Sequence, residues 1–214
     1  MTTCWNNAAP RDGRRYRGAD HPTPEKRMNP ETFILGRADA ALIVIDIQEK
    51  LAAAMDPAVI GQTVKNTGIL IEAAKLFGMP LVVSEQYRKG LGLTLAPLAE
   101  KLAGAGTLEK LYFDCVRDEG LAAAIAGCGR RTFIVTGIET HVCVLQTALS
   151  LLRKGYRAVV AADAVASRRK LDWEYALRAL ADAGALVYPT ETIAFMLLEK
   201  AGTDEFKKLA PLFK

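Results

Sequence analysis

The feature that most constrains the fold of this chain is an alternation of short apolar runs with longer amphipathic stretches. The runs are residues 40–46 (AALIVID), 80–86 (PLVVSEQ), 131–137 (RTFIVTG), 157–163 (RAVVAAD) and 185–190 (ALVYPT). Strands that are buried on both faces of a parallel sheet have this composition. Helical periodicity lies between them, over residues 58–77, 118–127, 139–154 and 168–183. The alternation predicts right-handed crossovers and a three-layer α/β/α fold with a mainly parallel, open, Rossmann-like sheet.

The first thirty residues differ from the rest of the chain. Residues 1–30 contain no Ile, Leu, Val or Phe, but they hold four of the nine prolines. Such a segment buries too little apolar surface to offset the entropy of ordering. We therefore predict a disordered tail over residues 1–30 and one folded domain over residues 31–214, which ends in a short helix after residue 200. Met28 is a second candidate for the start of translation.

Charge and hydropathy exclude several classes of partner. Residues 1–30 carry six Lys/Arg and three Asp/Glu, a balance of +3, and the remaining residues carry 22 against 21, a balance of +1. The domain therefore lacks the excess of basic residues that marks a nucleic-acid surface, although the run RDGRRYR from Arg11 leaves a weak polyanion-binding arm as an alternative to a solvated tail. No apolar run approaches the length of about 18 residues that spans a bilayer. Since the first thirty residues also lack the apolar core of a signal peptide, we expect a cytoplasmic protein with reduced thiols.

Polar residues at the ends of the predicted strands mark the candidate site, because ligands bind beyond the carboxyl ends of parallel strands. Asp46 ends the first strand, Glu85 accompanies the second, residues 137–143 follow the strand at 131, and Asp163 ends the next.

Cys143 is either a small core residue or a nucleophile. Free cysteine is among the most buried residue types, yet at about 100° per residue Cys143 points away from the apolar stripe predicted for its helix. Its place in the first turn exposes it to unpaired N–H groups and to the helix dipole, which favour a thiolate. The predicted stripe consists of Val142, Leu145, Leu149 and Leu152.

Two further residues are candidates for the site only if the fold brings them close to Cys143. Asp46 either caps the turn after its strand or accepts the proton of the thiol. Lys110, in TLEKLYFDC, is either an ordinary surface lysine or a cation placed between the acid and the thiol, where it would favour both anions. Cys115 and Cys128 have no comparable context, and we interpret both as structural.

Four segments resemble the isochorismatase-like cysteine hydrolase superfamily, and in particular its isochorismatase domain-containing branch. They are LIVIDIQ (42–48), SEQYRKGLG (84–92), LEKLYF (108–113) and TGIETHVCV (136–144), in the order that the family has them. The resemblance covers about residues 38 to 195.

The resemblance implies a cofactor-free hydrolase that cleaves a small amide, carbamoyl or related acyl substrate through a thioester. Asp46 would be the general base, Lys110 would stabilise the charged groups, and Cys143 would be the nucleophile. A cis peptide between Ile138 and Glu139 would direct the backbone N–H groups of Glu139 and Cys143 into an oxyanion hole. The resemblance also implies a homo-oligomer. The candidate substrate pocket consists of Gln48, Glu85, Tyr87 and Phe113.

The sequence departs from the metal-binding members of this superfamily. Nicotinamidases hold a metal with an Asp and two His downstream of the first strand, whereas no histidine lies between Asp46 and His141 here. We therefore expect no metal site, and we interpret His141 as a structural or pocket-rim residue. The alternative to an enzyme is a non-catalytic oligomeric interaction protein, or a thiol-redox protein in which Cys143 has a low pKa.

Overall fold

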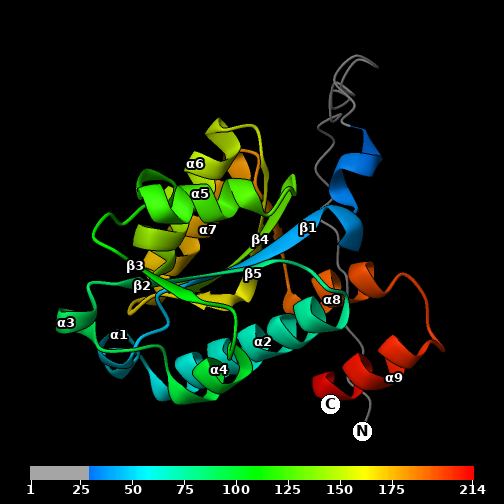
Figure 1. Cartoon of the computed structure of the whole chain (residues 1–214), viewed down its shortest axis with the longest axis horizontal. Helices are drawn as coiled ribbons and strands as arrows, with labels where there is room; N and C mark the ends of the chain where they lie inside the picture. Colours follow the sequence, from blue (N-terminus) through cyan, green and yellow to red (C-terminus); the bar gives the residue numbers. More distant parts are fainter. Residues whose placement is uncertain (1–28) are drawn as a thin grey trace, which may run out of the picture. The chain divides into compact units, whose positions relative to one another are not determined.

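The computed structural model describes residues 29–214, and residues 33–214 form one compact unit (Figure 1). The predicted disordered tail over residues 1–30 and the candidate start at Met28 lie outside the described residues, apart from Asn29 and Pro30. Within the described residues, no helix combines the length and apolar character needed to cross a membrane.

Six strands form one parallel sheet in the order β3-β2-β1-β4-β5-β6. The sequence order reverses between β1 and β4, and in such sheets the crevice at this reversal is where ligands bind. The fold class predicted from the sequence is confirmed. The strands are β1 (Ala40–Ile45), β2 (Leu81–Gln86), β3 (Thr107–Lys110), β4 (Thr132–Ile138), β5 (Arg157–Ala166) and β6 (Leu186–Tyr188).

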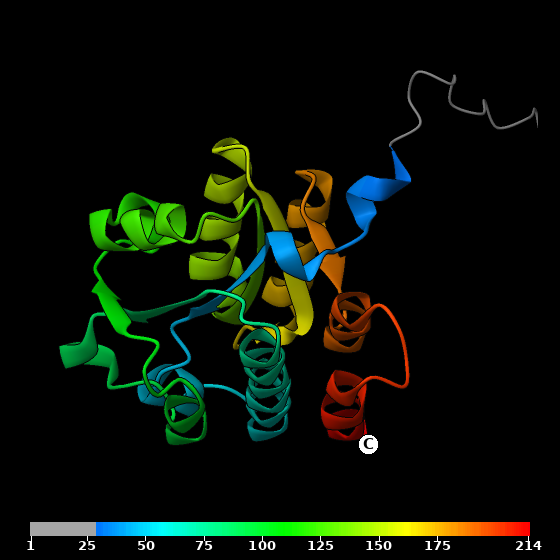
Figure 2. The same ribbon diagram turned by 45° about the vertical axis from the view of Figure 1, so that its right-hand side comes forward.

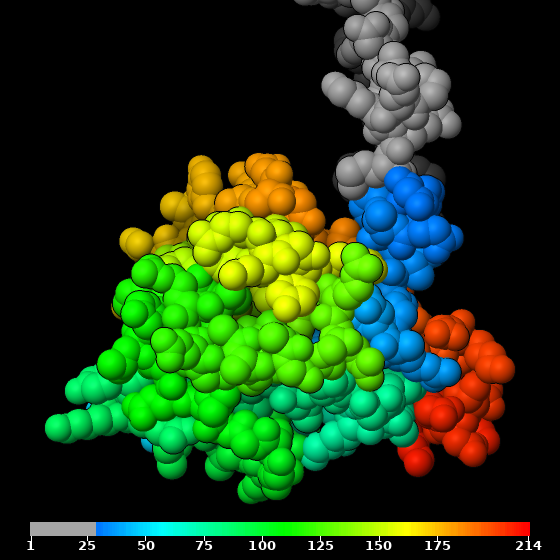
Figure 3. All heavy atoms as spheres, turned by 45° about the horizontal axis from the view of Figure 1, so that its top comes forward, coloured from blue at the N-terminus to red at the C-terminus, as the bar shows by residue number. Residues whose placement is uncertain are grey.

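Helices cover both faces of this sheet (Figures 1 and 2). One buried cluster joins the sheet to α2, α4 and α8, and a second joins it to α5, α6 and α7. Figure 3 shows the α5 and α6 region, in green to yellow, on the outer surface of the helices that cover this second cluster. The helices are α1 (Glu49–Ala53), α2 (Pro57–Leu76), α3 (Arg88–Leu91), α4 (Ala96–Lys101), α5 (Glu119–Gly127), α6 (Leu145–Arg153), α7 (Lys170–Asp182), α8 (Thr190–Leu198) and α9 (Asp204–Leu209).

Shorter helical turns connect these elements. Within residues 29–214, four are 3₁₀ turns: η2 (Pro30–Phe33), η3 (Arg37–Asp39), η4 (Cys115–Arg117) and η6 (Ala210–Phe213). The fifth, η5 (Thr140–Val144), is π-helical and leads directly from β4 towards α6.

Local sequence explains where the principal elements begin and end. All six residues of β1 are buried and apolar, as expected for a central parallel strand. The Asp56 carboxylate accepts a hydrogen bond from the Ala58 N–H at 2.8 Å, and Pro57 occupies the first turn of α2, so α2 starts with both a cap and a preset φ angle. Gly78, Gly155 and Gly184 have positive φ angles beyond α2, α6 and α7, where the sequence predicted left-handed residues.

Candidate active site

Asp46 lies immediately after β1, at the reversal in strand order. Its φ angle is +51°, in the left-handed region, and its side chain is fully buried. Both carboxylate oxygens are engaged: Oδ1 accepts a hydrogen bond from the Ser84 hydroxyl at 2.7 Å, and Oδ2 accepts one from Lys110. The carboxylate is therefore fixed in one orientation at the carboxyl edge of the sheet.

Lys110 is the last residue of β3 and is 1% exposed. Its Nζ lies 2.6 Å from Asp46 Oδ2, so the two form an ion pair inside the protein. Burial, the largest single influence, would lower the pKa of Lys110, but the charge of Asp46, the two nearby thiols and the hydrogen bond to Asp46 together outweigh it, and the pKa is raised above its ordinary value. The ammonium therefore stays charged, and of the two interpretations of Lys110 the surface lysine is wrong.

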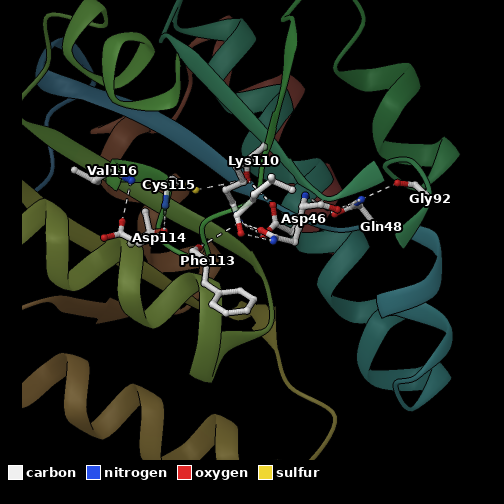
Figure 4. Close-up of polar contacts among 12 residues, drawn as sticks. Asp46, Gln48, Gly92, Lys110, Phe113, Asp114, Cys115 and Val116 are labelled. Carbon is white, nitrogen blue, oxygen red and sulfur yellow. Dashed lines mark hydrogen bonds and ion pairs between the residues drawn. The ribbon is translucent and has the colours of Figure 1, made fainter. Parts of the chain in front are cut away.

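Gln86 and Phe113 complete the surroundings of the lysine, and Figure 4 shows Phe113 on this side of the site. Lys110 Nζ donates to Gln86 Oε1 at 2.7 Å and to the Phe113 carbonyl oxygen at 3.2 Å. The sequence analysis assigned no role to Gln86 or Ser84. The available signal was their place in the segment SEQYRKGLG, which carries part of the family resemblance.

Cys143 lies in η5 and is 5% exposed. Its thiol lies near enough to Asp46 and Lys110 for both charges to act on its pKa. Burial and the negative charge of Asp46 raise the pKa of Cys143, and the positive charge of Lys110 offsets only part of this rise. The prediction that the helix start favours a thiolate is therefore wrong for the resting protein, in which Cys143 is a neutral thiol facing a carboxylate.

The buried face of the nucleophile helix also differs from the predicted stripe. Leu149, assigned to the core from the sequence, is 39% exposed. The prediction assumed a regular α-helix from residue 139, but the π-helical turn η5 adds a residue to the turn and changes the phase of α6. Val142, Leu145 and Leu152 of the predicted stripe are partly buried against the core, whereas the fully buried apolar residues of this segment are Val144, Ala148 and Leu151.

The turn before Cys143 contains the one cis peptide bond of the described residues, between Ile138 and Glu139. This is the position that the family resemblance implied. The Glu139 side chain points to the end of β5, where its Oε1 accepts hydrogen bonds from the Arg168 backbone N–H at 3.1 Å and from Arg168 Nε at 2.9 Å. These contacts hold the turn from the side opposite the lysine. His141, at the same turn, lies 3.0 Å from the Ser167 hydroxyl through Nδ1.

The four residues predicted to line a pocket fall into two pairs. Gln48 and Glu85 are buried, and their polar atoms bind the protein itself. Gln48 Nε2 donates to the carbonyl oxygens of Gln86 and Gly92, and Glu85 Oε1 accepts from the backbone N–H and hydroxyl of Thr94. Tyr87 and Phe113 are 46% and 53% exposed, so these two present apolar surface at the carboxyl edge of the sheet.

Cys115 is closer to the site than its sequence context suggested. It is fully buried, and its Sγ lies 3.6 Å from the Ser84 hydroxyl that binds Asp46. Burial, together with the nearby Asp46 charge, raises the pKa of Cys115 to about 11. A second thiol with a raised pKa therefore lies beside the base, against α6, where the Cys115 backbone N–H donates to the Thr147 hydroxyl at 3.0 Å.

A cavity of about 570 Å³ lies one strand further along the sheet edge, between the starts of α2 and α7 and the end of β5. Val59, Ser167, Arg168 and Trp173 are among its lining residues, whereas Asp46, Lys110 and Cys143 are not. Among residues 29–214, no group of three His, Cys, Asp or Glu side chains is arranged to hold a metal ion.

The fold and this arrangement of side chains define an isochorismatase-like α/β hydrolase. The family model described as "Isochorismatase domain" matches residues 40–192, and the chain therefore belongs to the isochorismatase family of hydrolases. Isochorismatase domain-containing protein 1 of Danio rerio is 34% identical over 84% of the chain, although the match spans only 62% of that relative's own length. The secreted isochorismatase effector Isc1 of Phytophthora sojae is also 34% identical, over 87% of the chain and 91% of the relative.

Solved structures share the same fold. A structure described as MAR1 ribonuclease from Caenorhabditis elegans is 32% identical, with a TM-score of 0.76 over 84% of this chain and 91% of that one. YcaC from Escherichia coli, described as an octameric hydrolase of unknown specificity, has a TM-score of 0.78 over 84% of this chain and 89% of its own. At 24% identity, YcaC supports the fold alone.

Proposed function

We propose that this protein is a cysteine hydrolase that cleaves a small amide, carbamoyl or related acyl substrate through a thioester intermediate. Cys143 is the nucleophile, Asp46 is the general base, and Lys110 stabilises the negative charges around them. The observation that carries this proposal is the buried Asp46–Lys110 pair, with 2.6 Å between Oδ2 and Nζ, whose charges both act on the buried Cys143 thiol.

In the first half-reaction, the Cys143 S–H proton passes to Asp46 while the sulfur forms a bond to the substrate carbonyl carbon. Because the pKa of the thiol is raised in the resting protein, the proton leaves only as the carbonyl is attacked. Asp46 then gives this proton to the departing nitrogen as the C–N bond breaks. The products of this step are a free amine and an acyl group on Cys143 Sγ.

In the second half-reaction, water replaces the amine. Asp46, ionised again, takes a proton from the attacking water and gives it to the sulfur as the C–S bond breaks, which restores the Cys143 thiol and releases the acid. The backbone N–H groups of Glu139 and Cys143 form the proposed oxyanion hole for both steps, and one such donor typically lowers the barrier by about 3–4 kcal/mol. No metal or organic cofactor takes part in this scheme.

Burial of the site limits what it accepts. The three side chains are 0–5% exposed, so the substrate is small and reaches the thiol only as the covering side chains move aside. The exposed rings of Tyr87 and Phe113 form the proposed walls of the entrance. Gln48 and Glu85 then support this entrance from behind, through their hydrogen bonds to the segment that ends at Thr94.

The redox alternative receives less support from the same geometry. Thiols that sense oxidants are accessible and have a low pKa, whereas Cys143 is buried and has a raised one. A non-catalytic interaction protein remains as the rival, supported by the near-complete burial of the three side chains. The Caenorhabditis elegans structure is described as a ribonuclease. The experiment must therefore also distinguish RNA cleavage from amide hydrolysis.

The deciding experiment incubates wild-type protein and the Cys143→Ser variant with a panel of small primary amides, carbamoyl compounds and thioesters, and in parallel with RNA. We expect ammonia or amine release by the wild type alone, together with an acyl adduct on the Cys143 peptide by mass spectrometry. Cleavage of RNA by both proteins would instead support a ribonuclease. No turnover and no adduct across the panel would overturn the hydrolase proposal in favour of the non-catalytic one.

We also propose that the protein forms a homo-oligomer, by analogy with the octameric description of YcaC. Light scattering should then give a mass that is a multiple of 23.2 kDa. A monomer mass at micromolar concentration would contradict this. A cytoplasmic location stays a prediction from the sequence.

A further inference from the structure

The ammonium group of Lys110 has three N–H donors, and the protein accepts all three. The acceptors are Asp46 Oδ2 at 2.6 Å, Gln86 Oε1 at 2.7 Å and the Phe113 carbonyl oxygen at 3.2 Å. An ammonium donates no more than three hydrogen bonds. Lys110 therefore has no donor left for a substrate atom, and it acts on the reaction through its charge alone.

Gln86 is the neutral side chain among these three acceptors, and its own orientation is fixed. Its Nε2 donates to the Leu111 carbonyl oxygen at 2.9 Å, so the amide oxygen must face the ammonium. Its backbone is held by Gln48, which accepts from the Gln86 N–H at 2.7 Å and donates to the Gln86 carbonyl oxygen at 2.9 Å. Both glutamines are buried, and Gln48 is visible beside Asp46 in Figure 4.

A lysine side chain has a flexible four-carbon stem, so an ion pair with one carboxylate does not by itself fix the position of the ammonium group. A neutral acceptor on the opposite side holds the ammonium in place without competing with Asp46 for its charge. A carboxylate in the same place would share that charge and weaken the attraction to Asp46.

We propose that Gln86 is a positioning residue of the active site, which aims the Lys110 ammonium at Asp46 and Cys143 and keeps its donors away from the substrate. The inference rests on the proposed hydrolase function of the same site. In this arrangement the carbonyl oxygen of the substrate binds the backbone donors of the oxyanion hole. Lys110 makes no hydrogen bond to the substrate.

The test observes the ammonium itself, by ¹⁵N–¹H NMR of protein labelled on lysine Nζ. An ammonium held by three buried acceptors exchanges slowly with water, so we expect a Lys110 cross-peak that is absent in a Lys110→Met variant. Gln86→Met removes the acceptor while keeping the length of the side chain, and should broaden or abolish that peak. Gln62→Met, the same change at a glutamine of α2 that binds Asn66 and makes no contact with Lys110, should leave it unchanged.

A second substitution separates positioning from charge. Gln86→Glu keeps an oxygen acceptor, so the cross-peak should persist with a shifted frequency. On a substrate found by the amide panel, both Gln86 variants should lower kcat by about tenfold or more with little change in KM, since the residue makes no contact with substrate. An unchanged cross-peak in folded Gln86→Met protein, or no Lys110 cross-peak in the wild type, would overturn the inference. Because the NMR measurement needs no turnover, an inactive wild type would count against the proposed function and not against this inference.

Discussion

At the scale of single residues, the pKa of Cys143 is raised first by burial and then by the nearby charge of Asp46. The Lys110 ammonium favours the thiolate and offsets only part of this rise. The thiol is thus kept neutral until a carbonyl group arrives to accept the negative charge. Cys143 therefore reacts with the carbonyl group of a bound substrate but reacts slowly with thiol reagents dissolved in the solvent.

The Asp46→Asn substitution should therefore have opposite effects on two kinds of reactivity. Turnover should disappear, because an amide does not accept the thiol proton. Alkylation of Cys143 by iodoacetamide at pH 8 should accelerate by about tenfold or more, because removing the negative charge lowers the pKa of the thiol and one pKa unit is a tenfold change in thiolate. Peptide mass spectrometry gives the rate for each cysteine, and Cys128 in the same sample is the internal control. Slower labelling of Cys143 in this variant would show that Asp46 does not face the thiol.

The buried ion pair makes a second prediction about single residues. Lys110→Met leaves the Asp46 carboxylate unpaired inside the protein, which should lower the free energy of unfolding by about 3–5 kcal/mol. The double variant Asp46→Asn/Lys110→Met removes both charges and should recover much of that loss. As a matched control, Lys101→Met removes an ion pair of the same 2.6 Å length with Glu72 at the surface, and should cost less than about 1 kcal/mol. Urea denaturation measures all three, and equal losses for Lys101→Met and Lys110→Met would contradict the burial argument.

At the scale of elements, the sequence predicted most of what positions the site. β1, β2, β4 and the long helix α2 begin and end within two residues of their predicted bounds, because their apolar periodicity is strong. β3, which carries Lys110, was not predicted, since a four-residue edge strand with a largely exposed TLEK sequence has no apolar run. The π-helical turn η5 was missed because its i to i+5 hydrogen bonds leave no signature in residue type.

The approach of β4 to β1 gives a prediction at this scale. Gly137 pairs with Ile45 in the sheet and has a φ angle of +131°, and a Cβ atom at this position would lie 2.0 Å from the Ile45 carbonyl oxygen. Both strands must separate to admit a methyl group, which would displace Asp46 and the turn before Cys143 together. Gly137→Ala should therefore cost more than about 3 kcal/mol of stability and abolish turnover.

Gly61 provides the matched control for this substitution. It lies inside α2, and a Cβ atom there would meet nothing within 4 Å. Gly61→Ala should stabilise the protein by about 0.5–1 kcal/mol, since alanine favours the helix. Thermal unfolding of the two variants should thus give shifts of opposite sign. A Gly137→Ala protein as stable as the wild type would show that β1 and β4 are further apart at their carboxyl ends.

At the scale of the whole molecule, the site lies in the layer between the sheet and helices α5, α6 and α7, and it shares this layer with a second thiol. Cys115 and Cys143 belong to the same buried cluster. Both have a raised pKa because the folded protein buries them near Asp46. The protonated thiols thus contribute to the stability of the entire fold.

The sign of this contribution sets its pH range. A group whose pKa is higher in the folded state stabilises the fold fully below its unfolded pKa, about 8.5 for cysteine, and the stabilisation is lost as the pH rises towards the folded pKa. For Cys115, whose folded pKa is about 11, the free energy of unfolding should fall by about 2 kcal/mol between pH 8 and pH 10. Cys143 should add a loss in the same range of pH.

Urea denaturation at pH 8 and pH 10 tests this linkage in the wild type and in Cys115→Ala. The variant loses packing at both pH values, so the informative quantity is the difference between them, which should be smaller than that of the wild type by about 2 kcal/mol. Cys128→Ala is the control, because Cys128 is only partly buried and its removal should leave most of the difference in place. If Cys115→Ala lost as much stability as the wild type between the two pH values, the thiol would already be accessible to water, and the dry layer that keeps Cys143 protonated beside Asp46 would not exist.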